Sequence, residues 1–548
     1  MPRTSEEYLK FVKEIPSVRD LVEKRCEENR ERVFLYFKDK QYTYEEINDL
    51  TDRMATGLAE LGIKKGSRVS IFMYNSPEWI LSFFALAKLG ATTVTVNTAF
   101  KGDPLVYPIT QSESEAVIVD SRLLDSYKNV EDELKTVKNV VVAVMDDSID
   151  SGKMPSKPYV TLDELQKYKP KEEVKAESKL GDPMCIIYTS GTTGPSKGCV
   201  LPNGFGLYNG FLIADYLEYG KDDIVYTCLP LFHGNALALS LLASLVAGAS
   251  FALGEKFSAS KFWEEIVRYN ATEFNFIGTI LHILYKQPPS PYEKEHRVRV
   301  AFGAPVPKEI YKECQERFNV LFVEGYGLTE NGIVTLWSYK DAKEGKMIPG
   351  SMGKETPFAE VKIMDTETGE ILPPNQLGEI VSRPRLPYAM HLEYYKMPEK
   401  TVEAWQNLWF HTGDLGYMDE NGAFYFVDRI KDAIRRRGEN ISSWELEKAI
   451  LRNPKIAECA AIPVKSELGE DEVKVCLVLK PGETMTPEEF MAWCEDNLPY
   501  FWIPRYVEFK DSLPKTPTER VEKYKLRAEG ITPNTWDRER AGYKIKKK

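Results

Sequence analysis

The chain contains 548 residues, which is too many for one ordinary domain, and 43% of them are hydrophobic and 28% charged. Such a composition is typical of a globular protein with sizeable buried cores, and it excludes a disordered or collagen-like chain. Acidic residues outnumber basic ones by 83 to 72, so the net charge is −11 and broad binding to nucleic acid or to anionic membranes is disfavoured.

Neither the cysteines nor the N-terminus suggests an oxidising or membrane environment. The 8 cysteines are scattered without a CxxC pair, and 5 histidines add no zinc-binding spacing, so we expect a reduced, cytoplasmic protein. The N-terminus has early acidic residues and no apolar core, unlike a signal peptide. Residues 236–253 are apolar and just reach membrane-spanning length, but Gly248 divides them, which predicts a buried helix and a buried strand rather than a membrane span.

From the N-terminus onward, helical and strand patterns alternate. Residues 68–73 have a strand pattern, Ser76 followed by Pro77 is typical of a helix start, and this helix is expected to end at Gly90. Residues 91–97 then have a second strand pattern. This stretch therefore predicts a β-α-β unit.

The next part of the chain continues the alternation. Two near-continuous apolar runs, 116–120 and 139–147, predict strands that are covered on both faces. The charged residues 167–179 predict a surface connection that leads to the next strand.

The character of the sequence changes near residue 428, where a highly charged segment precedes a compact pattern of helices and strands. We therefore expect the α/β fold class, with a large N-terminal α/β domain of stacked sheets and helices at 1–427. A hinge is expected at 428–431, followed by a small mobile α+β domain at 432–548.

A strand pattern at 184–188 runs directly into the sequence TSGTTGPSKG at 189–198. Glycines let backbone N–H groups approach an anion, the hydroxyls add donors and the lysine adds positive charge, which predicts a loop that grips a polyphosphate. The GxxxxGK[ST] spacing of a Walker A loop is absent, and a plain surface turn is the alternative. The residues concerned are Thr189, Ser190, Gly191, Thr192, Thr193, Gly194 and Lys197.

This loop is the first of several motifs that follow one another along nearly the whole chain. Together they resemble the signature of the adenylate-forming superfamily, which includes acyl-CoA synthetases, the adenylation domains of peptide synthetases and firefly-type luciferases. The motifs are YTSGTTGPSKG (188–198), FGAPVP (302–307), EGYGLTE (324–330), HTGDLG (411–416), DRIKDAIRRRGENIS (428–442) and, more weakly, PKTPTERVEKYKLR (514–527).

The resemblance implies an AMP-forming acyl-CoA ligase that uses ATP, Mg²⁺ and coenzyme A. A carboxylic acid would attack ATP to give an acyl-adenylate and pyrophosphate, and CoA would then displace AMP. The segments 435–442 and 522–527 most resemble the branch that contains crotonobetaine/carnitine-CoA ligase-like and medium-chain or cyclic acyl-CoA synthetases. The alternatives are an enzyme that loads a carrier protein, which the lack of a following carrier domain disfavours, and an inactive ATP-binding homologue.

The nucleotide-binding residues are expected in the later motifs. Asp414 lies in a TGD sequence, and its carboxylate can bind both hydroxyls of a ribose, although such a sequence is more often a turn. By resemblance, Arg429 assists Asp414, and Tyr326 offers an aromatic face to adenine. Also by resemblance, Gly303, Ala304 and Pro305 form the opposing wall, Gly325 and Gly327 belong to the same site, Glu324 accepts from the adenine amino group, Thr329 donates to the α-phosphate, and Glu330 binds Mg²⁺.

The C-terminal motif departs from the pattern of the superfamily. Relatives usually carry a Gly-Lys pair after PKTxT, whose lysine contacts the reacting groups during adenylation, whereas this chain has Glu519 and Arg520. Arg520 keeps the positive charge, but a guanidinium and an ammonium group are not interchangeable. Lys523 or Lys525 is the alternative source of the adenylation cation.

In relatives the C-terminal domain rotates between the two half-reactions about a residue that corresponds to Lys431. The rotation is expected to exchange the 515–525 loop for a second loop, formed by Arg436, Arg437, Gly438 and Glu439. A solvated charged segment is the alternative interpretation of these residues.

The acid is expected to bind in a mostly apolar pocket of modest size, because the corresponding segments contain small and aromatic residues and no fixed cation. His233 follows an apolar LPLF run and would lie near the substrate carboxylate, although a lone histidine is more often a packed core residue. The lining residues implied by the resemblance are His233, Asn235, Phe276, Gly278, Thr279, Gly303, Asn331 and Gly332. The expected partners are a small carboxylic acid and CoA, with no nucleic acid and no membrane span, and the protein is a candidate homodimer.

Overall fold

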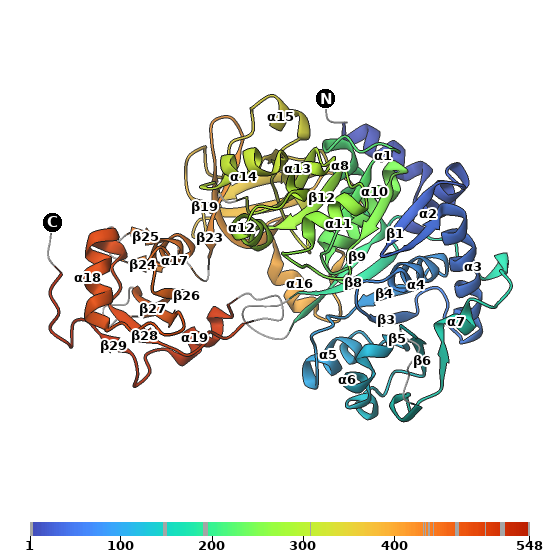
Figure 1. Ribbon diagram of the computed structural model, residues 1–548, viewed down its shortest axis with the longest axis horizontal. Coiled ribbons are helices and arrows are strands. Elements are labelled where there is room, and N and C mark those ends of the chain that lie inside the picture. Colours follow the sequence, from blue (N-terminus) through green and yellow to red (C-terminus); the bar gives the residue numbers. More distant parts are fainter. Residues whose placement is uncertain are drawn as a thin grey trace.

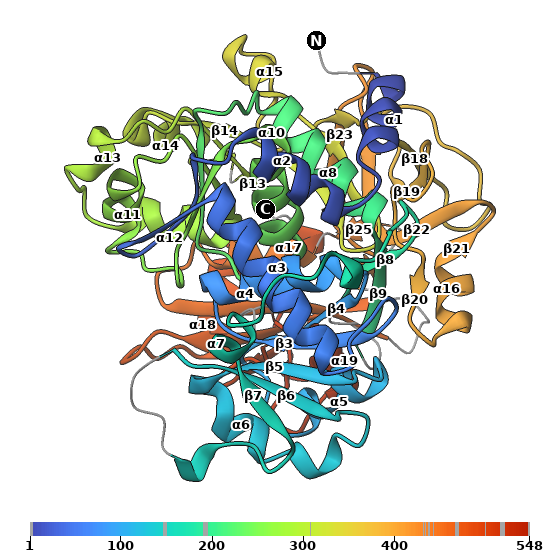
Figure 2. The same cartoon turned by 90° about the vertical axis from the view of Figure 1, so that its right-hand side faces the viewer.

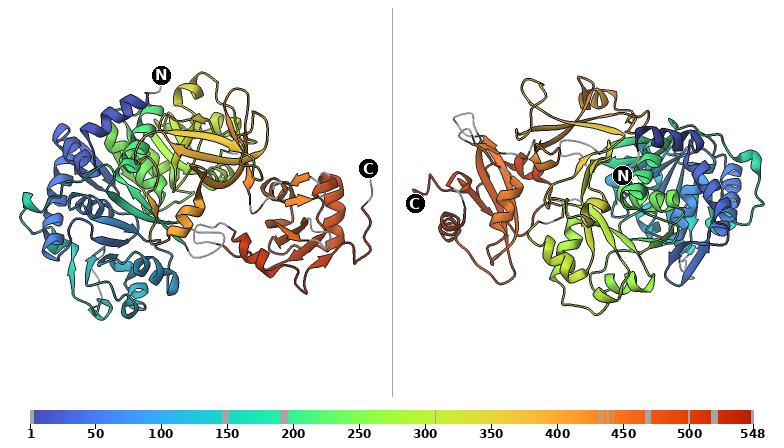
Figure 3. Two further views of the ribbon diagram at one scale, coloured as in Figure 1. Left: turned by 180° about the vertical axis from the view of Figure 1, so that it is seen from behind. Right: turned by 90° about the horizontal axis from the view of Figure 1, so that it is seen from above.

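The computed structural model describes residues 4–145, 151–189, 196–306, 308–430, 432, 434–436, 439–441, 443–465, 471–498, 500–515 and 521–545. A larger body contains the helices and strands up to β23, and a smaller body contains the elements from β24 to β29 (Figure 1). The two bodies lie next to each other along the longest axis of the structure (Figure 3).

The first large sheet runs in the order β14-β13-β12-β10-β11-β1-β2, and its strands are parallel except for the hairpin of β1 and β2. The carboxyl ends of β10, β12, β13 and β14 therefore lie along the same edge, which is where ligands bind in parallel sheets. Its strands are β1 (Val33–Phe37), β2 (Lys40–Thr43), β10 (Ile224–Thr227), β11 (Ser250–Leu253), β12 (Glu273–Ile277), β13 (Val300–Ala304) and β14 (Leu321–Val323).

The second large sheet runs in the order β20-β9-β8-β4-β3-β5-β6-β7, and Figure 2 shows β3, β5 and β6 within it. It is parallel from β8 to β7, whereas β8 and β9 form an antiparallel pair and β20 joins the free edge of β9. Its strands are β3 (Arg68–Phe72), β4 (Thr92–Thr95), β5 (Ala116–Asp120), β6 (Asn139–Ala143), β7 (Tyr159–Thr161), β8 (Pro183–Thr189), β9 (Lys197–Pro202) and β20 (Glu393–Tyr394).

The local sequence signals explain several of these elements. Ser76 caps α4 (Pro77–Lys88) by accepting a hydrogen bond from the Trp79 backbone N–H, so the predicted helix start is confirmed. All five residues of β5 are buried, as its continuous apolar run predicted. Gly248 adopts φ +68° and ends the buried helical stretch before β11, which confirms the predicted helix and strand.

The remaining helices of the larger body cover the sheets. Within the ranges described above, none combines the length and apolar character needed to cross a membrane. They are α1 (Ser5–Glu14), α2 (Val18–Glu28), α3 (Tyr44–Glu60), α5 (Asp103–Gln111), α6 (Leu124–Lys128), α7 (Leu162–Leu165), α8 (Asn203–Tyr216), α9 (Gly234–Ala236), the π-helical turn η5 (Leu237–Leu241), α10 (Leu242–Ala247), α11 (Phe262–Arg268), α12 (Gly278–Lys286), α13 (Tyr292–Glu295), α14 (Tyr311–Phe318), α15 (Tyr339–Lys343) and α16 (Pro398–Ala404). Short 3₁₀ turns are η1 (Ser121–Leu123), η2 (Glu131–Glu133), η3 (Ser151–Lys153), η4 (Glu172–Val174) and, in the smaller body, η6 (Tyr500–Trp502).

Antiparallel strands complete the larger body. One small sheet has the order β15-β16-β17, and the other has the order β18-β19-β22-β21 with β23 also paired to β22. The strands are β15 (Gly325–Leu328), β16 (Gly332–Leu336), β17 (Lys354–Glu355), β18 (Ala359–Met364), β19 (Gly378–Pro384), β21 (Trp405–Gln406), β22 (Trp409–Met418) and β23 (Phe424–Arg429).

The smaller body has hydrophobic clusters of its own, and among the described residues no such cluster joins it to the larger body. Its α+β content matches the expected pattern, and the exact boundaries at 427 and 432 stay a prediction. Its elements are β24 (Ile434–Arg436), β25 (Glu439–Ile441), α17 (Ser443–Ile450), β26 (Ile456–Lys465), β27 (Asp471–Leu479), α18 (Pro487–Asn497), β28 (Tyr506–Phe509), α19 (Lys523–Glu529) and β29 (Trp536–Asp537).

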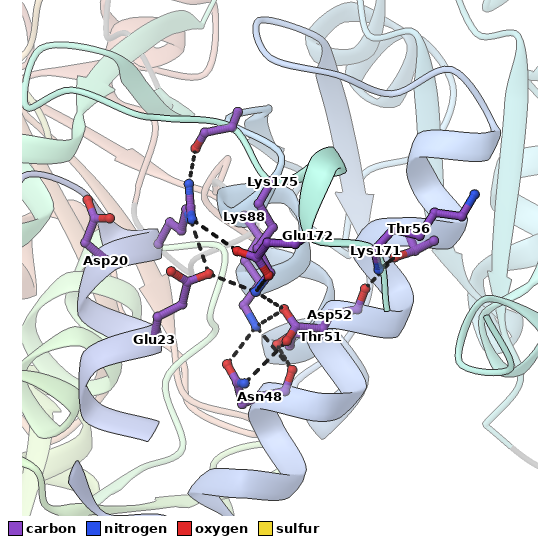
Figure 4. A network of polar contacts seen from close by, with 12 residues as sticks. Asp20, Glu23, Asn48, Thr51, Asp52, Thr56, Lys88, Lys171, Glu172 and Lys175 are labelled. Carbon is purple, nitrogen blue, oxygen red and sulfur yellow. Dashed lines mark hydrogen bonds and ion pairs between the residues drawn. The ribbon is translucent and has the colours of Figure 1, made fainter. Parts of the chain in front are cut away.

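The charged connection before β8 is not wholly solvated. Lys175 is only 10% exposed and contacts Asp52 at 3.1 Å and Glu23 at 3.2 Å, so it anchors the connection to α2 and α3 (Figure 4). Lys88 at the end of α4 is fully buried, and its ammonium group lies 2.7 Å from the same Asp52 carboxylate. Burial lowers the pKa of Lys88, whereas the charge of Asp52 opposes this shift. The Asp52 carboxylate thus pairs with the buried Lys88 and shares Lys175 with Glu23 and Glu172.

We expect Asp52→Asn to destabilise the larger body by about 3–5 kcal/mol, because it leaves the fully buried ammonium group of Lys88 without its anion. The midpoint of urea denaturation measures the effect. Asp49→Asn on the same helix is the matched control, since the pair of Asp49 with Arg53 is exposed and should matter little. Equal midpoints for the two variants would contradict this role of Asp52.

Candidate active site

Four site segments follow directly from the carboxyl edge of the first large sheet. Residues 228–235 follow β10, Ala304 and Pro305 lie at the end of β13, and Glu324 follows β14. Ile277 at the end of β12 pairs with Ala304, and both side chains are exposed at this edge. The parallel order of the strands therefore brings together segments that are almost a hundred residues apart in sequence.

Two glycines allow the close backbone approach that this edge requires. A Cβ atom on Gly303 would lie 2.2 Å from the carbonyl oxygen of Phe276, and one on Gly327 would lie 1.9 Å from the carbonyl oxygen of Gly332. Neither space can hold a methyl group, so the chain needs glycine at both positions.

Asp414 lies between Tyr326 and Arg429, two residues that the resemblance assigned to the same nucleotide site. The Tyr326 hydroxyl donates to Asp414 Oδ2 at 2.6 Å, and Arg429 Nε lies 2.8 Å from Asp414 Oδ1. Burial raises the pKa of Asp414 to about 6, while the Arg429 charge acts in the opposite direction. The contact between the Tyr326 hydroxyl and Asp414 was not foreseen, because the expected role of Tyr326 concerned only its ring.

Glu379 supports the backbone that carries Asp414. Its Oε1 atom accepts from the Gly413 backbone N–H at 2.8 Å, and its Oε2 atom lies 2.7 Å from Nδ1 of His411. The Thr412 hydroxyl donates to the carbonyl oxygen of Ile380 at 2.5 Å. This part of β22 is a strand rather than a turn, and β19 holds it in place. Glu379 could not be found from the sequence because nothing near it marks it.

Glu330 lies beside the flank of the glycine-rich loop. Its Oε1 atom accepts from the Tyr394 hydroxyl at 2.9 Å, and its backbone carbonyl accepts from the His391 N–H at 2.8 Å. The Nζ atom of Lys197, the first residue of β9, lies 4.1 Å from the centroid of the Tyr394 ring. The structure therefore brings the predicted metal ligand and the predicted loop lysine to the same tyrosine.

The donor set around Glu330 suits Mg²⁺ bound together with a nucleotide. Across the described part of the chain, no group of three His, Cys, Asp or Glu side chains is arranged to hold a metal by itself. Mg²⁺ in nucleotide sites is usually bound through one or two carboxylates and the substrate phosphates, and it keeps several waters. A single buried carboxylate next to a phosphate loop fits this pattern.

Glu324 is a buried acceptor at the end of β14. It is 4% exposed, and burial raises the pKa of its carboxyl to about 8, while a backbone hydrogen bond from Val306 acts the other way. Its Oε2 atom has no hydrogen-bond partner among the described residues. An unpaired buried acceptor is costly, so this atom is suited to receive a donor from a ligand.

The titration of Glu324 should be visible in the stability of the protein. Its folded pKa of about 8 lies above that of an unfolded glutamate, roughly 4.3, so the folded state alone holds the proton between these values and stability falls as pH rises. A glutamine side chain does not titrate, so Glu324→Gln removes this loss of stability with rising pH. We therefore expect the melting temperature of the variant to rise relative to the parent from pH 5 to 8.5.

The control for this measurement is Glu316→Gln, which changes an exposed glutamate of α14. Its melting temperature should follow that of the parent across the same pH range. Parallel curves for Glu324→Gln and the parent would contradict the raised pKa.

The residues around His233 are held by side chains from neighbouring strands and loops. The Asn75 side-chain amide donates to the carbonyl oxygen of Leu229 at 2.9 Å, and the Thr95 hydroxyl donates to that of Phe232 at 3.0 Å. His233 is half-buried and precedes α9, where a Cβ atom on Gly234 would meet no other atom within 4 Å. This open space is consistent with a ligand pocket in front of His233.

The other predicted pocket residues differ in what their side chains do. Asn235 accepts from Asn275 at 2.9 Å, and Thr279 is exposed in the first turn of α12. The Phe276 ring is fully buried and packs against Phe322 at a centroid distance of 5.7 Å. Asn275 and Phe276 point to opposite faces of β12, so Asn275 reaches Asn235 while Phe276 packs in the core.

Asn331 and Gly332 shape the turn between β15 and β16. The Asn331 side chain accepts from the Leu328 N–H at 2.8 Å and donates to Ser382 Oγ at 3.0 Å. Gly332 adopts φ +67°, and Gly278 lies close to Pro305. Asn331 therefore orders the loop that carries Thr329, and contact of these residues with an acid stays a prediction.

The candidate cations of the smaller body make contacts within that body. Lys523 Nζ lies 2.8 Å from Glu447 Oε1 and donates to Ser443 Oγ at 2.6 Å. Lys525 pairs with Glu522. Neither ammonium group is directed to the larger body in this conformation.

In the second loop of the smaller body, Arg436 likewise makes its contacts within that body. Arg436 is buried, with its Nε atom 2.7 Å from Glu472 and an N–H donating to the carbonyl oxygen of Ile503 at 2.8 Å. Glu439 belongs to β25. The remaining predicted residues lie outside the described residues: Ser190, Gly191, Thr192, Thr193, Gly194, Lys431, Arg437, Gly438 and Arg520.

Comparison with known proteins relates this site to a large group of relatives. The chain is 31% identical over 498 residues to the crotonobetaine/carnitine–CoA ligase of Salmonella agona (strain SL483), covering 89% of this chain and 93% of the relative. ATP-bound MatB from Rhodopseudomonas palustris superimposes with a TM-score of 0.79 at 25% identity, over 93% of this chain and 98% of MatB. O-succinylbenzoate coenzyme A synthetase (MenE) from Bacillus subtilis, in complex with ATP and magnesium ion, superimposes with a TM-score of 0.76 at 25% identity, over 92% of this chain and 99% of MenE.

Two family models also match the chain. The model described as AMP-binding enzyme matches residues 22–391, and the model of its C-terminal domain matches residues 445–520. The first match alone covers more than half of the chain, and it contains the loop at 189–198 and the residues from Glu324 to Glu330. The chain therefore belongs to the AMP-binding enzyme family.

Proposed function

We infer that the protein is an AMP-forming acyl-CoA ligase that joins a carboxylic acid to coenzyme A at the expense of ATP, with Mg²⁺. The observation that carries this inference is that Glu330 and Lys197 both contact Tyr394. The hydrogen-bonded pair of Tyr326 and Asp414 adds the residues proposed to bind adenine and ribose. A metal-binding carboxylate, a phosphate-binding lysine and a ribose-binding carboxylate are what adenylation requires. The named ligase activity of the Salmonella relative supports the same conclusion.

In the first half-reaction, Asp414 holds the ribose hydroxyls, and the Tyr326 ring faces the adenine. Glu324 Oε2 accepts from the adenine amino group, while Thr329 donates to the α-phosphate and Glu330 contributes a ligand to Mg²⁺. The acid carboxylate attacks the α-phosphorus in line, and pyrophosphate leaves as the new P–O bond forms. Bound Mg²⁺ neutralises phosphate charge, which lowers the barrier to this attack.

In the second half-reaction, the sulfur of CoA attacks the acyl carbonyl carbon and AMP leaves with the electron pair of the anhydride C–O bond. No protein nucleophile is needed, since the adenylate is already activated. The 8 cysteines of the chain are all buried, and burial raises the pKa of thiols such as Cys228, to about 12, so they are poor nucleophiles. Rotation of the smaller body about Lys431 would replace Arg520 by the loop at 436–439.

The acid is proposed to be small and mostly apolar. The exposed Ile277 and the open space in front of Gly234 support an apolar pocket of modest size near His233. Among the described residues named for this pocket, none is a lysine or an arginine that would pair with a second carboxylate. Crotonobetaine and carnitine, for which the Salmonella relative is named, carry a fixed trimethylammonium charge and serve as the charged comparison to apolar acids.

A panel of acids incubated with ATP, Mg²⁺ and CoA tests this function. We expect at least one small acid to give equal amounts of acyl-CoA, AMP and pyrophosphate. Turnover only when a carrier protein replaces CoA would favour the loading enzyme, and no turnover with any acid would favour the inactive homologue. Glu330→Ala, which removes the proposed metal ligand, is the negative control.

Two further expectations concern the cellular location and the oligomeric state of the enzyme. We propose a cytoplasmic location, supported by 8 free cysteines that are buried without disulfides. A homodimer is also proposed, and size-exclusion chromatography with light scattering would measure it.

A further inference from the structure

Tyr394 connects two parts of the site that lie far apart in the sequence. It is the second residue of the short strand β20, where it pairs with Cys199 of β9. Its side chain is 2% exposed, its hydroxyl contacts Glu330, and its ring faces Lys197. We propose that Tyr394 is a positioning residue that holds the metal-binding carboxylate and the phosphate-loop lysine in one fixed arrangement, which rests on the proposed metal role of Glu330.

The hydroxyl group fixes the orientation of Glu330. A buried hydroxyl needs an acceptor, and the 2.9 Å bond to Oε1 supplies one while restricting rotation of the carboxylate. The backbone of Glu330 is held as well, because its carbonyl oxygen accepts from the His391 N–H at 2.8 Å and lies 3.0 Å from His391 Nδ1. The segment 391–394 thus restrains both the main chain and the side chain of Glu330, and outer contacts of this kind tune metal affinity.

The face of the same ring restrains Lys197. An ammonium group 4.1 Å from the ring centroid is within the range of a cation–π contact. Lysine has a long, flexible side chain, so without this contact Nζ would sample many positions. The ring therefore keeps the ammonium group of Lys197 next to Tyr394.

Tyr394 is itself held firmly enough to perform this role. Its backbone N–H donates to Thr401 Oγ1 at 2.9 Å, and its ring packs against that of His391 at a centroid distance of 5.2 Å. The pairing of Tyr394 with Cys199 of β9 fixes the position of the ring along the strand that begins at Lys197. As a result, the distance between the metal ligand and the lysine is set by one rigid side chain.

The two functions of Tyr394 can be separated with two variants of the full-length protein. Tyr394→Phe removes the hydroxyl and keeps the ring, whereas Tyr394→Leu removes both. Mn²⁺ binding to the enzyme–ATP complex, followed by electron paramagnetic resonance, should weaken about tenfold in Tyr394→Phe. ATP binding without metal should be unchanged in Tyr394→Phe and about fivefold weaker in Tyr394→Leu, because only the latter loses the contact with Lys197.

Tyr395→Phe is the matched control, since it removes a neighbouring hydroxyl that bonds to Glu113 at 3.2 Å, away from Glu330. It should leave both affinities unchanged. Should Mn²⁺ affinity in Tyr394→Phe stay within twofold of the parent, the proposed role of the hydroxyl is wrong. Equal metal-free ATP affinity in Tyr394→Leu and Tyr394→Phe would overturn the role of the ring. If Tyr394→Leu does not fold, Tyr394→Met, whose flexible side chain fills a similar space without an aromatic face, replaces it.

Glu330→Gln separates this inference from the function on which it rests. If Glu330→Gln leaves Mn²⁺ affinity unchanged, the metal role of Glu330 is wrong and the proposed site must be revised. If Glu330→Gln weakens Mn²⁺ binding but Tyr394→Phe does not, only the positioning role of Tyr394 is overturned.

Discussion

Asp414→Ala is expected to slow acid-dependent exchange of pyrophosphate into ATP by roughly 30-fold to 1000-fold, equivalent to about 2–4 kcal/mol of transition-state binding. The carboxylate is 1% exposed and lies between the Tyr326 hydroxyl and Arg429, so its loss removes the proposed ribose contact and leaves both partners unpaired. Isotope exchange at saturating acid and Mg²⁺ measures the effect.

Two companion measurements make the interpretation specific. Asp414→Asn keeps an acceptor for Tyr326 but loses the charge, so it should fall between the parent and Asp414→Ala. Tyr326→Phe keeps the carboxylate and should lose less activity than Asp414→Ala. Exchange within twofold of the parent in a folded Asp414→Ala would show that the ribose is held elsewhere.

Arg520→Ala is expected to slow formation of the acyl-adenylate by several orders of magnitude, because a cation that stabilises developing charge contributes strongly to such a reaction. Arg520 itself lies outside the described residues, but the base of its loop is closed by pairing between Lys515 and Val521. Lys523, the alternative cation, contacts Glu447 and Ser443. We therefore expect Lys523→Ala to have a much smaller effect than Arg520→Ala.

Single-turnover measurements distinguish the two half-reactions. Arg520→Ala should react normally from preformed acyl-adenylate and CoA, while Arg520→Lys should be tolerated in both steps. If Lys523→Ala strongly slowed formation of the acyl-adenylate and Arg520→Ala did not, Lys523 would be the adenylation cation. In that case the contacts with Glu447 and Ser443 would have to break during the reaction.

Local signals in the sequence were sufficient to predict elements that are marked by a capping residue or by a run of apolar residues. Ser76 and Pro77 started α4 where expected, and the apolar run of β5 was buried along its whole length. The motifs also named Asp414 and Tyr326, which are 88 positions apart in sequence and share a hydrogen bond, while their roles toward a nucleotide stay a prediction. A motif resemblance can point to such a pair because it carries information about tertiary contacts that composition and periodicity lack.

Residues that act through another residue were not predictable in this way. Glu379 and Tyr394 stand in strands without any distinctive neighbours, and their importance follows only from what β19 and β20 place beside them. The charged connection was expected on the surface, yet Lys175 is nearly buried because Asp52 and Glu23 face it. Each case depends on a partner that is remote in sequence, which a local pattern cannot identify.

The complete burial of the cysteines has a practical consequence for measuring domain motion. Thiol-reactive dyes attack exposed thiolates, so the parent protein should take up little label without any cysteine being removed. A pair of exposed positions, such as Glu399 in the larger body and Glu488 in the smaller one, can then be changed to cysteine and coupled to donor and acceptor fluorophores. Energy transfer between single pairs of dyes would report whether the smaller body moves relative to the larger one during each turnover, with little background from labelled native cysteines.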